Sequence, residues 1–569
     1  MSRQASSSIL FNHLPDKQHS AMTHPIIAVS AGVLTGLAAF AQNVPDSKKQ
    51  PDSKGENAQP RMNVLFIASD DLCSAMNAFG DPRVHTPNLD LLASRGMVFN
   101  NAYNQSPLSG PSRASVMTGL RPDKTGVHDL SGKFRYAVPD AVTLPELFKN
   151  NGYYTCRVGK IYHAGVPSDI GQPGSDDPQS WTVTYNPIGK DRTDEYLLQG
   201  HVTPGTWMAL DCADDEMTDA ISANVAVSLI RARYSNVGSA YRGPARTDIP
   251  PRRATQPFFM AVGFYRPHIP YIAPRKYFDL YPEVDLPECF EQEWLTKPTL
   301  SRTSSTWNGG ATEQECKDAV RAYYASVSFI DAQVGKLLSI LEEMDLMDNT
   351  IIVFWSDHGY MLGDHGLWQK QTLFERTAHQ PLMIYAPGIT DGRECDRIVE
   401  CVDIYPTIAE LACLTPTTPL DGVCLTPLLK NPSIEWDRPA FTQQARTLVD
   451  PSRPDFNRDP DVPFKFNPSL DDRSATLFGR SVRYGRYRYT EWDEGREGCE
   501  LYDYETDPLE RNNLAHSPGG EFSEVIEKLK DMLHSSYDMD QIRETQKTIE
   551  RNRAAAGQAL ERLHPAVTY

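Results

Sequence analysis

Residues 109–113 read Ser-Gly-Pro-Ser-Arg and bring together a hydroxyl group, a helix-starting proline and a fixed positive charge. Pro111 suits the first turn of a helix because it has no backbone N–H, and Gly119 is predicted to end that helix. Free N–H groups at the helix start favour an anion beside Ser109, and Arg113 adds charged donors about one turn later. An ordinary capped helix in a surface loop explains these five residues equally well. Other segments of the sequence must therefore distinguish a reactive site at Ser109 from such a helix.

Acidic residues follow two apolar segments that we predict as strands, 63–68 and 350–355. The first runs into Asp70-Asp71 and the second into Asp357-His358. Adjacent carboxylates repel unless a cation lies between them, and parallel strands end at one edge of a sheet. Three carboxylates and a neutral donor suit Ca²⁺ or Mg²⁺ better than a metal that prefers thiols. Each acidic pair, taken alone, is also typical of a turn or helix cap.

Basic residues follow two further predicted strands, 153–158 and 258–262. Lys160 and His163 follow the first strand, and His268 lies between prolines after the second. A loop lysine and a structural histidine are the alternatives for these positions. A polar loop close behind Asp357-His358 contains three more candidates: His365, Trp368 and Lys370.

Short apolar segments alternate with helix-like ones, which predicts an α/β fold with a large, mixed, mostly parallel sheet between helices. We assign residues 61–440 to this catalytic domain and residues 441–569 to a smaller C-terminal α+β subdomain built on an antiparallel sheet. There, residues 480–492 predict two strands joined at Gly485, and residues 521–533 predict a helix. Residues 447–472 are rich in Pro, Asp and Arg and predict a loop over the pocket.

The 569 residues carry a net charge of −18 at pH 7. This charge argues against nucleic acid as a partner, because a nucleic-acid-binding protein needs a basic face. It also opposes the approach of an anionic substrate. A site for such a substrate must therefore be locally basic.

The N-terminal region predicts export. Residues 1–41 contain an apolar run that begins after Met22, a second candidate start, and ends in Ala39-Phe40-Ala41, as cleavable secretory signals do. A membrane anchor is the alternative, but the run is short and rich in small residues. Residues 42–60 predict a disordered linker. Export permits disulfides, and the pairs 395/401 and 413/424 are candidates, with free thiols as the alternative.

The order of these segments resembles the type I sulfatases, which depend on formylglycine. Their signature is Cys or Ser, any residue, Pro, any residue, Arg, and here it begins at Ser109. The Asp-His pair at Asp357 resembles the branch that includes iduronate-2-sulfatase. Serine in place of cysteine corresponds to the bacterial version. The likeness extends over residues 61–515 with gaps.

The resemblance implies an alkaline-phosphatase-like fold, bound Ca²⁺ and oxidation of Ser109 to Cα-formylglycine by a maturation enzyme of the serine type. The implied metal ligands are Asp70, Asp71, Ser109, Asp357 and His358. The implied catalytic residues are Ser109, Arg113, Lys160, His163, His268 and Lys370. Candidate substrate-binding residues are His365, Trp368 and Arg483, the last as a partner for a substrate carboxylate.

We therefore predict a periplasmic or secreted sulfatase without a stable membrane anchor, acting on a sulfated oligosaccharide or polysaccharide. The branch favours exo-acting 2-O-desulfation of a sulfated uronic acid. Three alternatives remain: desulfation of an algal polysaccharide at another position, a phosphate or phosphonate ester hydrolase on the same fold, and a non-catalytic glycan-binding protein.

Overall fold

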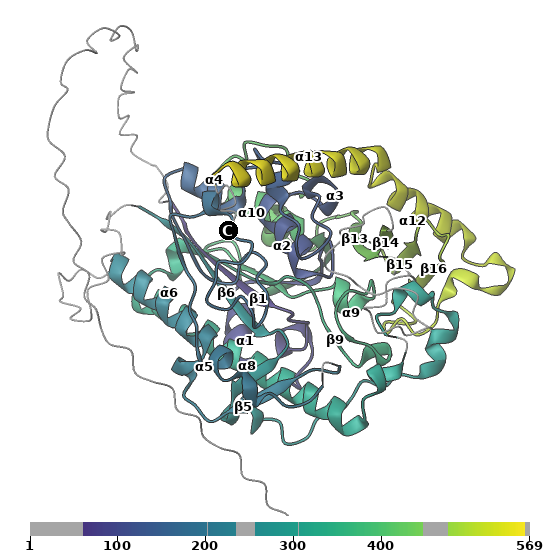
Figure 1. Cartoon of the computed structure of the whole chain (residues 1–569), viewed down its shortest axis with the longest axis horizontal. Helices are drawn as coiled ribbons and strands as arrows, with labels where there is room; N and C mark the ends of the chain where they lie inside the picture. Colours follow the sequence, from purple (N-terminus) through teal and green to yellow (C-terminus); the bar gives the residue numbers. More distant parts are fainter. Residues whose placement is uncertain (1–60, 202, 235–255, 305, 448–475, 564–569) are drawn as a thin grey trace, which may run out of the picture. The chain divides into compact units, whose positions relative to one another are not determined.

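The central sheet of this computed structural model has eight strands in the order β12-β2-β11-β8-β1-β6-β3-β4 (Figure 1). The structure describes residues 61–201, 203–234, 256–304, 306–447 and 476–563. The predicted signal region, the linker and most of the predicted 447–472 loop lie outside these residues. The strands are β1 (Asn63–Asp70), β2 (Met97–Tyr103), β3 (Tyr154–Gly159), β4 (Val183–Tyr185), β6 (Phe258–Pro267), β8 (Thr350–Ser356), β11 (Leu382–Tyr385) and β12 (Arg393–Glu400).

The sheet is mostly parallel, as predicted. β1 runs parallel to β6 and β8, β3 runs parallel to β6 and β4, and β12 runs parallel to β2. Only β11 among these strands is antiparallel to its neighbours. The four strands predicted from the sequence are β1, β3, β6 and β8, which lie side by side and bring their polar ends to one edge.

Helices cover both faces of the sheet. Val64 and Phe66 enter one buried core, and Leu65 and Ile67 enter another on the opposite face, as strand alternation requires. Figure 1 shows the two groups of helices on either side of β1 and β6. The first core includes α2 (Ser109–Thr118), α4 (Leu144–Asn150) and α10 (Ile404–Leu411), and the second includes α1 (Pro87–Ala93), α6 (Thr218–Tyr234) and α8 (Glu313–Glu343).

The helix predicted around Pro111 is α2, and all of its residues are buried. Ser109 is its first helical residue, after the extended Leu108. Gly119 follows its end with φ of 69°, a left-handed conformation that glycine adopts without strain. The sequence therefore fixes both ends of the element that presents Ser109.

The C-terminal segment forms the predicted antiparallel sheet, in the order β13-β14-β15-β16. Gly485 has a φ of 55° and lies in the turn between β14 and β15. Residues after 60 form one compact unit, so the proposed boundary at 440/441 stays a prediction. The elements are β13 (Ala440–Thr447), β14 (Thr476–Tyr484), β15 (Tyr487–Trp492), β16 (Cys499–Asp503), α12 (Ser523–Ser535) and α13 (Met539–Leu563).

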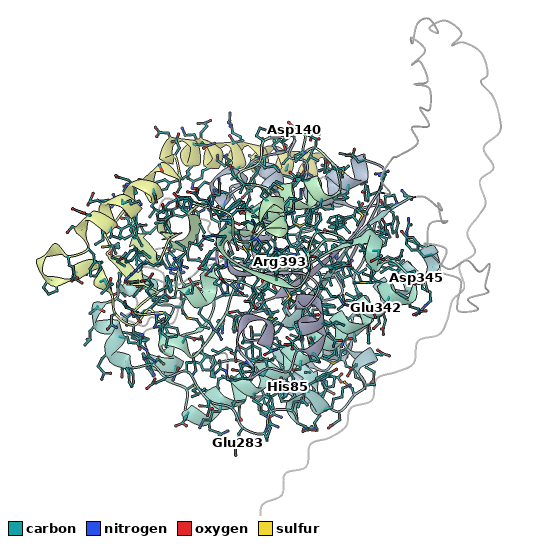
Figure 2. All side chains as sticks on the ribbon, turned by 180° about the vertical axis from the view of Figure 1, so that it is seen from behind. His85, Asp140, Glu283, Glu342, Asp345 and Arg393 are labelled. Carbon is teal, nitrogen blue, oxygen red and sulfur yellow. The ribbon has the colours of Figure 1, made fainter. Side chains whose placement is uncertain are left out.

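The described helices include none that is both long and apolar enough to cross a membrane. All ten cysteines are unpaired, so neither candidate disulfide is formed. Figure 2 shows charged side chains, among them Asp140, Glu283 and Asp345, extending from the surface.

Candidate active site

The carboxyl ends of β1 and β8 bring Asp70, Asp71, Asp357 and His358 together, and all four are fully buried. The Asp71 N–H donates to Asp357 Oδ1 at 3.0 Å. Ser109 Oγ lies 3.3 Å from Asp70 Oδ1 and 3.3 Å from His358 Nε2. Two adjacent pairs of residues, far apart in the sequence, thus form the predicted cluster around Ser109.

Arg113 joins these groups from α2. Its Nη2 donates to Asp70 Oδ1 at 3.0 Å and its Nε donates to Asp357 Oδ2 at 2.9 Å. Its Nη1 donates to the carbonyls of Lys160 and Ile161. One buried guanidinium therefore connects β1, β8 and the segment after β3.

Two lysines supply further positive charge. Lys160 Nζ lies 2.5 Å from Asp70 Oδ2, and Lys370 Nζ lies 2.5 Å from Asp71 Oδ1. Burial raises the pKa of Asp70, but Lys160 and Arg113 outweigh it and hold that pKa below its usual range. Burial lowers the pKa of Lys160 despite Asp70. Arg113, Lys160 and Lys370 thus balance the three carboxylates of the cluster, so a divalent cation bound there would make the pocket positive, as an anionic substrate requires.

Two histidines complete the predicted set. His268 Nδ1 lies 2.5 Å from the Ile269 carbonyl, and its Nε2 lies 3.8 Å from Asp71 Oδ2. Burial and Lys370 lower the pKa of His268 well below its usual value. Burial, followed by Lys160, lowers the pKa of His163 to about 3. Both imidazoles are therefore neutral before substrate binds.

The donor atoms fit a divalent cation. The Gly359 carbonyl lies 2.8 Å from His358 Nδ1, which assigns the proton to Nδ1 and leaves a lone pair on Nε2. This Nε2 lies 3.3 Å from Asp71 Oδ1 and 3.6 Å from Asp357 Oδ2. Acceptors that face one another repel without a cation, and Asp71 Oδ2 is buried without a hydrogen-bond donor among the described residues. Oxygen-rich ligands of this kind suit Ca²⁺.

Supporting residues that the sequence analysis did not identify hold this geometry. Asp71 has a φ of 65°, and Tyr323 from α8 donates to its carbonyl at 2.7 Å. Arg266 donates to the carbonyl of His268 at 2.9 Å and pairs with Asp191 at 3.1 Å. Nothing in the local sequence identifies the long-range contacts of Tyr323 with Asp71 and of Arg266 with Asp191.

The loop that carries Lys370 has a support of its own. Gln369 and Gln371 flank the lysine with φ of 70° and 73°. The Gln371 N–H donates to the Pro107 carbonyl at 3.1 Å, and Arg446 from β13 donates to the Gln371 carbonyl. The loop is thus tied to the segment before Ser109 and to the C-terminal sheet.

The three candidate substrate-binding residues have partners within the protein. His365 Nδ1 lies 2.8 Å from Glu293, and Trp368 donates to Asn308 at 3.0 Å. Arg483 donates to backbone carbonyls and packs over the Tyr504 ring at 4.1 Å. Their role in substrate binding stays a prediction.

Comparisons with known proteins identify the family of this chain. The family model described as Sulfatase matches residues 62–414, so the chain belongs to the sulfatase family of sulfuric ester hydrolases. Human iduronate 2-sulfatase is 30% identical over 551 residues, which cover 84% of this chain and 95% of that protein. A sulfatase of Formosa agariphila is 31% identical over 520 residues, which cover 86% of this chain and 88% of that protein.

Solved structures show the same fold at lower identity. The phosphonate monoester hydrolase of Agrobacterium radiobacter aligns with a TM-score of 0.62 at 22% identity, covering 84% of this chain and 95% of that one. A structure described as a 2-O GAG sulfatase aligns with a TM-score of 0.60 at 22% identity, covering 85% of this chain and 93% of that one. These likenesses confirm the predicted alkaline-phosphatase-like fold.

Proposed function

We propose that the chain is an exported sulfatase that removes sulfate from a glycan, acting from the chain end on the 2-O-sulfate of a uronic acid. The observation that carries the sulfatase chemistry is the buried cluster of acidic and basic side chains around Ser109. The iduronate 2-sulfatase relatives, aligned along most of their length, support the uronic acid. The apolar run before residue 42 supports export.

Formylglycine formed from Ser109 and a bound Ca²⁺ would supply an acidified hydroxyl for attack on sulfur. Asp70, Asp71, Asp357 and His358 would hold the cation. Arg113 is fixed by two carboxylates and two carbonyls, so its charge beside Ser109 needs no rearrangement during the reaction.

The remaining residues would bind the sulfate group and transfer protons. Lys370 would bind sulfate oxygens, because its side chain is 10% exposed, whereas that of Lys160 is fully buried. Burial, followed by the charges of Lys370 and Lys160, lowers the pKa of His268. A bound sulfate would offset the lysine charges, so that His268 could take up a proton from solvent and give it to the departing sugar oxygen. His163 is neutral in the free protein. It would accept the proton of the second hydroxyl at position 109 when sulfate leaves.

A phosphate or phosphonate ester hydrolase is the second candidate, because phosphonate monoester hydrolases share the fold. Initial rates on p-nitrophenyl sulfate and p-nitrophenyl phosphate separate the two. A higher kcat/KM for the phosphate ester would contradict the sulfatase proposal.

The first test is the mass of the peptide that contains residue 109, from protein made in a host with serine-type maturation. Formylglycine has two hydrogens fewer than serine, so we expect a loss of about 2 Da and turnover of p-nitrophenyl sulfate. Ser109→Ala should have neither property, and we expect its activity to fall at least about a thousandfold. Full turnover by Ser109→Ala would exclude the mechanism.

A further inference from the structure

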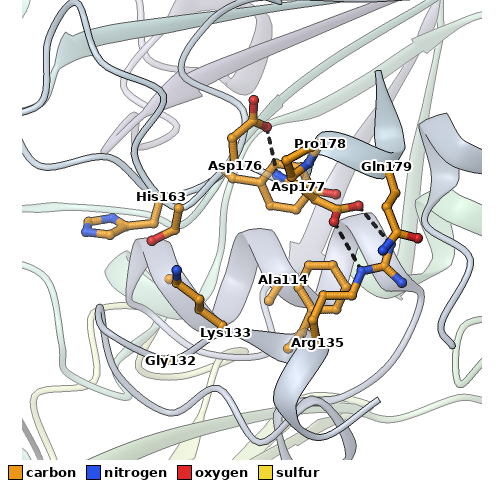
Figure 3. A pocket seen from close by; sticks show the side chains of 13 residues that line it. Ala114, Gly132, Lys133, Arg135, His163, Asp176, Asp177, Pro178 and Gln179 are labelled. Atoms are coloured by element: carbon orange, nitrogen blue, oxygen red, sulfur yellow. Dashed lines mark hydrogen bonds and ion pairs between the residues drawn. The ribbon is translucent and has the colours of Figure 1, made fainter. Parts of the chain in front are cut away.

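A cavity of about 370 Å³ opens beside the reacting position. Its wall includes Gly110 and Ala114 from α2, the first of which directly follows Ser109. Tyr162 and His163 form another part, and residues 132–135 and 175–179 close it (Figure 3). The cavity therefore adjoins the site along the flank of α2.

The acidic and arginine side chains of this wall are already paired. Arg135 Nη2 lies 2.8 Å from both Asp177 and Glu146. Asp176 is 2.8 Å from Arg157 and accepts a hydrogen bond from Trp181 at 2.9 Å. None of these groups is free to bind an ionic ligand.

Lys133 differs from these residues. It is exposed, and no carboxylate of the described residues lies within 4.0 Å of its ammonium group. Figure 3 shows its side chain pointing toward the part of the wall that contains His163. His163 Nδ1 is buried and has no hydrogen-bond partner in the described part of the chain. An unpaired cation and an unsatisfied imidazole nitrogen thus belong to the same wall.

The wall also has an aromatic part. Phe134 and Tyr162 belong to it, are each 5% exposed, and stack on each other with ring centroids 6.1 Å apart and an interplanar angle of 17°. A cavity of this volume is in the range of small-ligand sites, and a mixed aromatic and polar wall matches the two kinds of surface on a sugar ring.

We propose that this cavity is a subsite for a second anionic group on the glycan, which Lys133 binds while the scissile sulfate lies at Ser109. The proposal rests on the function proposed above and adds that Lys133 recognises the second negative charge of the substrate, either the uronic acid carboxylate or a further sulfate. A free cation here offers local attraction that the net charge of −18 does not. Carboxylate and sulfate would both satisfy Lys133, so the test must distinguish them.

The test compares three sulfated disaccharides that differ only in their second substituent: none, a carboxylate or a second sulfate. We expect Lys133→Gln to lower kcat/KM about two- to fivefold for one of the doubly charged substrates, mainly through KM, as loss of one partly exposed ion pair predicts. The singly charged disaccharide should change much less. The substrate that responds identifies the group that Lys133 binds.

Lys430→Gln is the matched control. Lys430 is also exposed, and its carbonyl accepts a hydrogen bond from Arg393 at the start of β12, far along the sheet from the end that carries Ser109. If both lysine variants give the same ratio of doubly to singly charged kcat/KM as the unmodified protein, the subsite proposal is wrong.

A binding measurement separates this proposal from the proposed function. Calorimetric titration of the same disaccharides into Ser109→Ala, with and without Lys133→Gln, needs no turnover. Weaker binding of a doubly charged disaccharide only in the double variant supports the subsite. Equal affinities overturn the subsite proposal. Absence of sulfatase activity in the protein without substitutions, with residue 109 oxidised, contradicts only the proposed function.

Discussion

Glu375 is an acidic residue whose ionisation connects the catalytic part of the chain to the C-terminal sheet. Its carboxylate accepts hydrogen bonds from Tyr103 at 2.8 Å and from Arg488 of β15 at 2.5 Å. Burial raises the pKa of Glu375, but Arg488 and then Arg483 outweigh it and lower the pKa to about 2. The folded state therefore favours the ionised form.

This pKa gives stability a defined pH dependence. The contribution of Glu375 is fully present above the unfolded pKa of about 4.3 and is lost as pH falls through the folded value of about 2. Glu375→Gln should lower the free energy of unfolding by about 3 kcal/mol from pH 5 to 8, and by about 1 kcal/mol less at pH 3.5. Thermal unfolding across this range, with matched buffers, measures the difference.

The control is Glu343→Gln, which removes an exposed ion pair with Arg231. Its effect should stay within about 0.5 kcal/mol at every pH. If the difference in the free energy of unfolding between Glu375→Gln and the original protein stays constant down to pH 3.5, Glu375 stabilises the fold through packing and not through its charge.

Residue types and spacing predicted the buried cluster because carboxylates at strand ends need a cation and lie at a shared edge. Asp70, Asp71, Asp357 and His358 are in contact, as that argument requires. The residues that orient them were not predictable in this way. Tyr323 reaches Asp71 from the middle of a 31-residue helix, and its local sequence is that of any buried helix face.

At the scale of elements, two glycines decide how closely β3 approaches β6. Gly159 and Gly263 face each other in the register of these strands, and the Lys160 N–H donates to the Gly263 carbonyl at 2.9 Å. A Cβ at residue 263 would lie 1.7 Å from the Lys160 carbonyl oxygen. Close strand approach at this point therefore fixes the backbone that carries Lys160.

Gly263→Ala should separate the two strand ends and displace Lys160 from Asp70. We expect a loss of about 3 kcal/mol or more in stability and at least a hundredfold lower activity in any folded fraction. Gly388→Ala is the control, because Gly388 has a φ of 71° but nothing within 4 Å of a new Cβ, so strain alone should cost about 1 kcal/mol. Soluble yield and Tm measure the stability of both variants, and kcat measures their activity. Wild-type values for Gly263→Ala would refute the argument.

The sequence predicted the central strands because each is a fully buried apolar run with a clear end. It did not identify β11, which is short and reverses the direction of the sheet between β2 and β8. Pairing direction depends on the path of distant connections, which periodicity does not contain. The hairpin at Gly485 was predictable because its turn is local.

At the scale of the whole molecule, charge is unevenly arranged. The net charge is −18, yet Arg113, Lys160 and Lys370 gather at the site. The long-range field repels an anionic glycan. The three cations balance the three carboxylates of the site, so the proposed Ca²⁺ would supply the net attraction over a few ångströms. Salt screens exposed charges beyond about 10 Å at 0.1 M and beyond about 30 Å at 0.01 M, but it screens buried pairs much less.

Added salt should therefore remove the repulsion before it weakens the attraction. Between 10 and 150 mM NaCl at constant Ca²⁺, we expect kcat/KM for a multiply sulfated oligosaccharide to rise about two- to fivefold, mainly through association. The singly charged p-nitrophenyl sulfate should change less than twofold, because repulsion scales with substrate charge. Initial rates at substrate concentrations well below KM measure both dependences. A steady fall for the oligosaccharide would mean that local cations control its approach even at low salt, and that the acidic surface has no part in substrate capture.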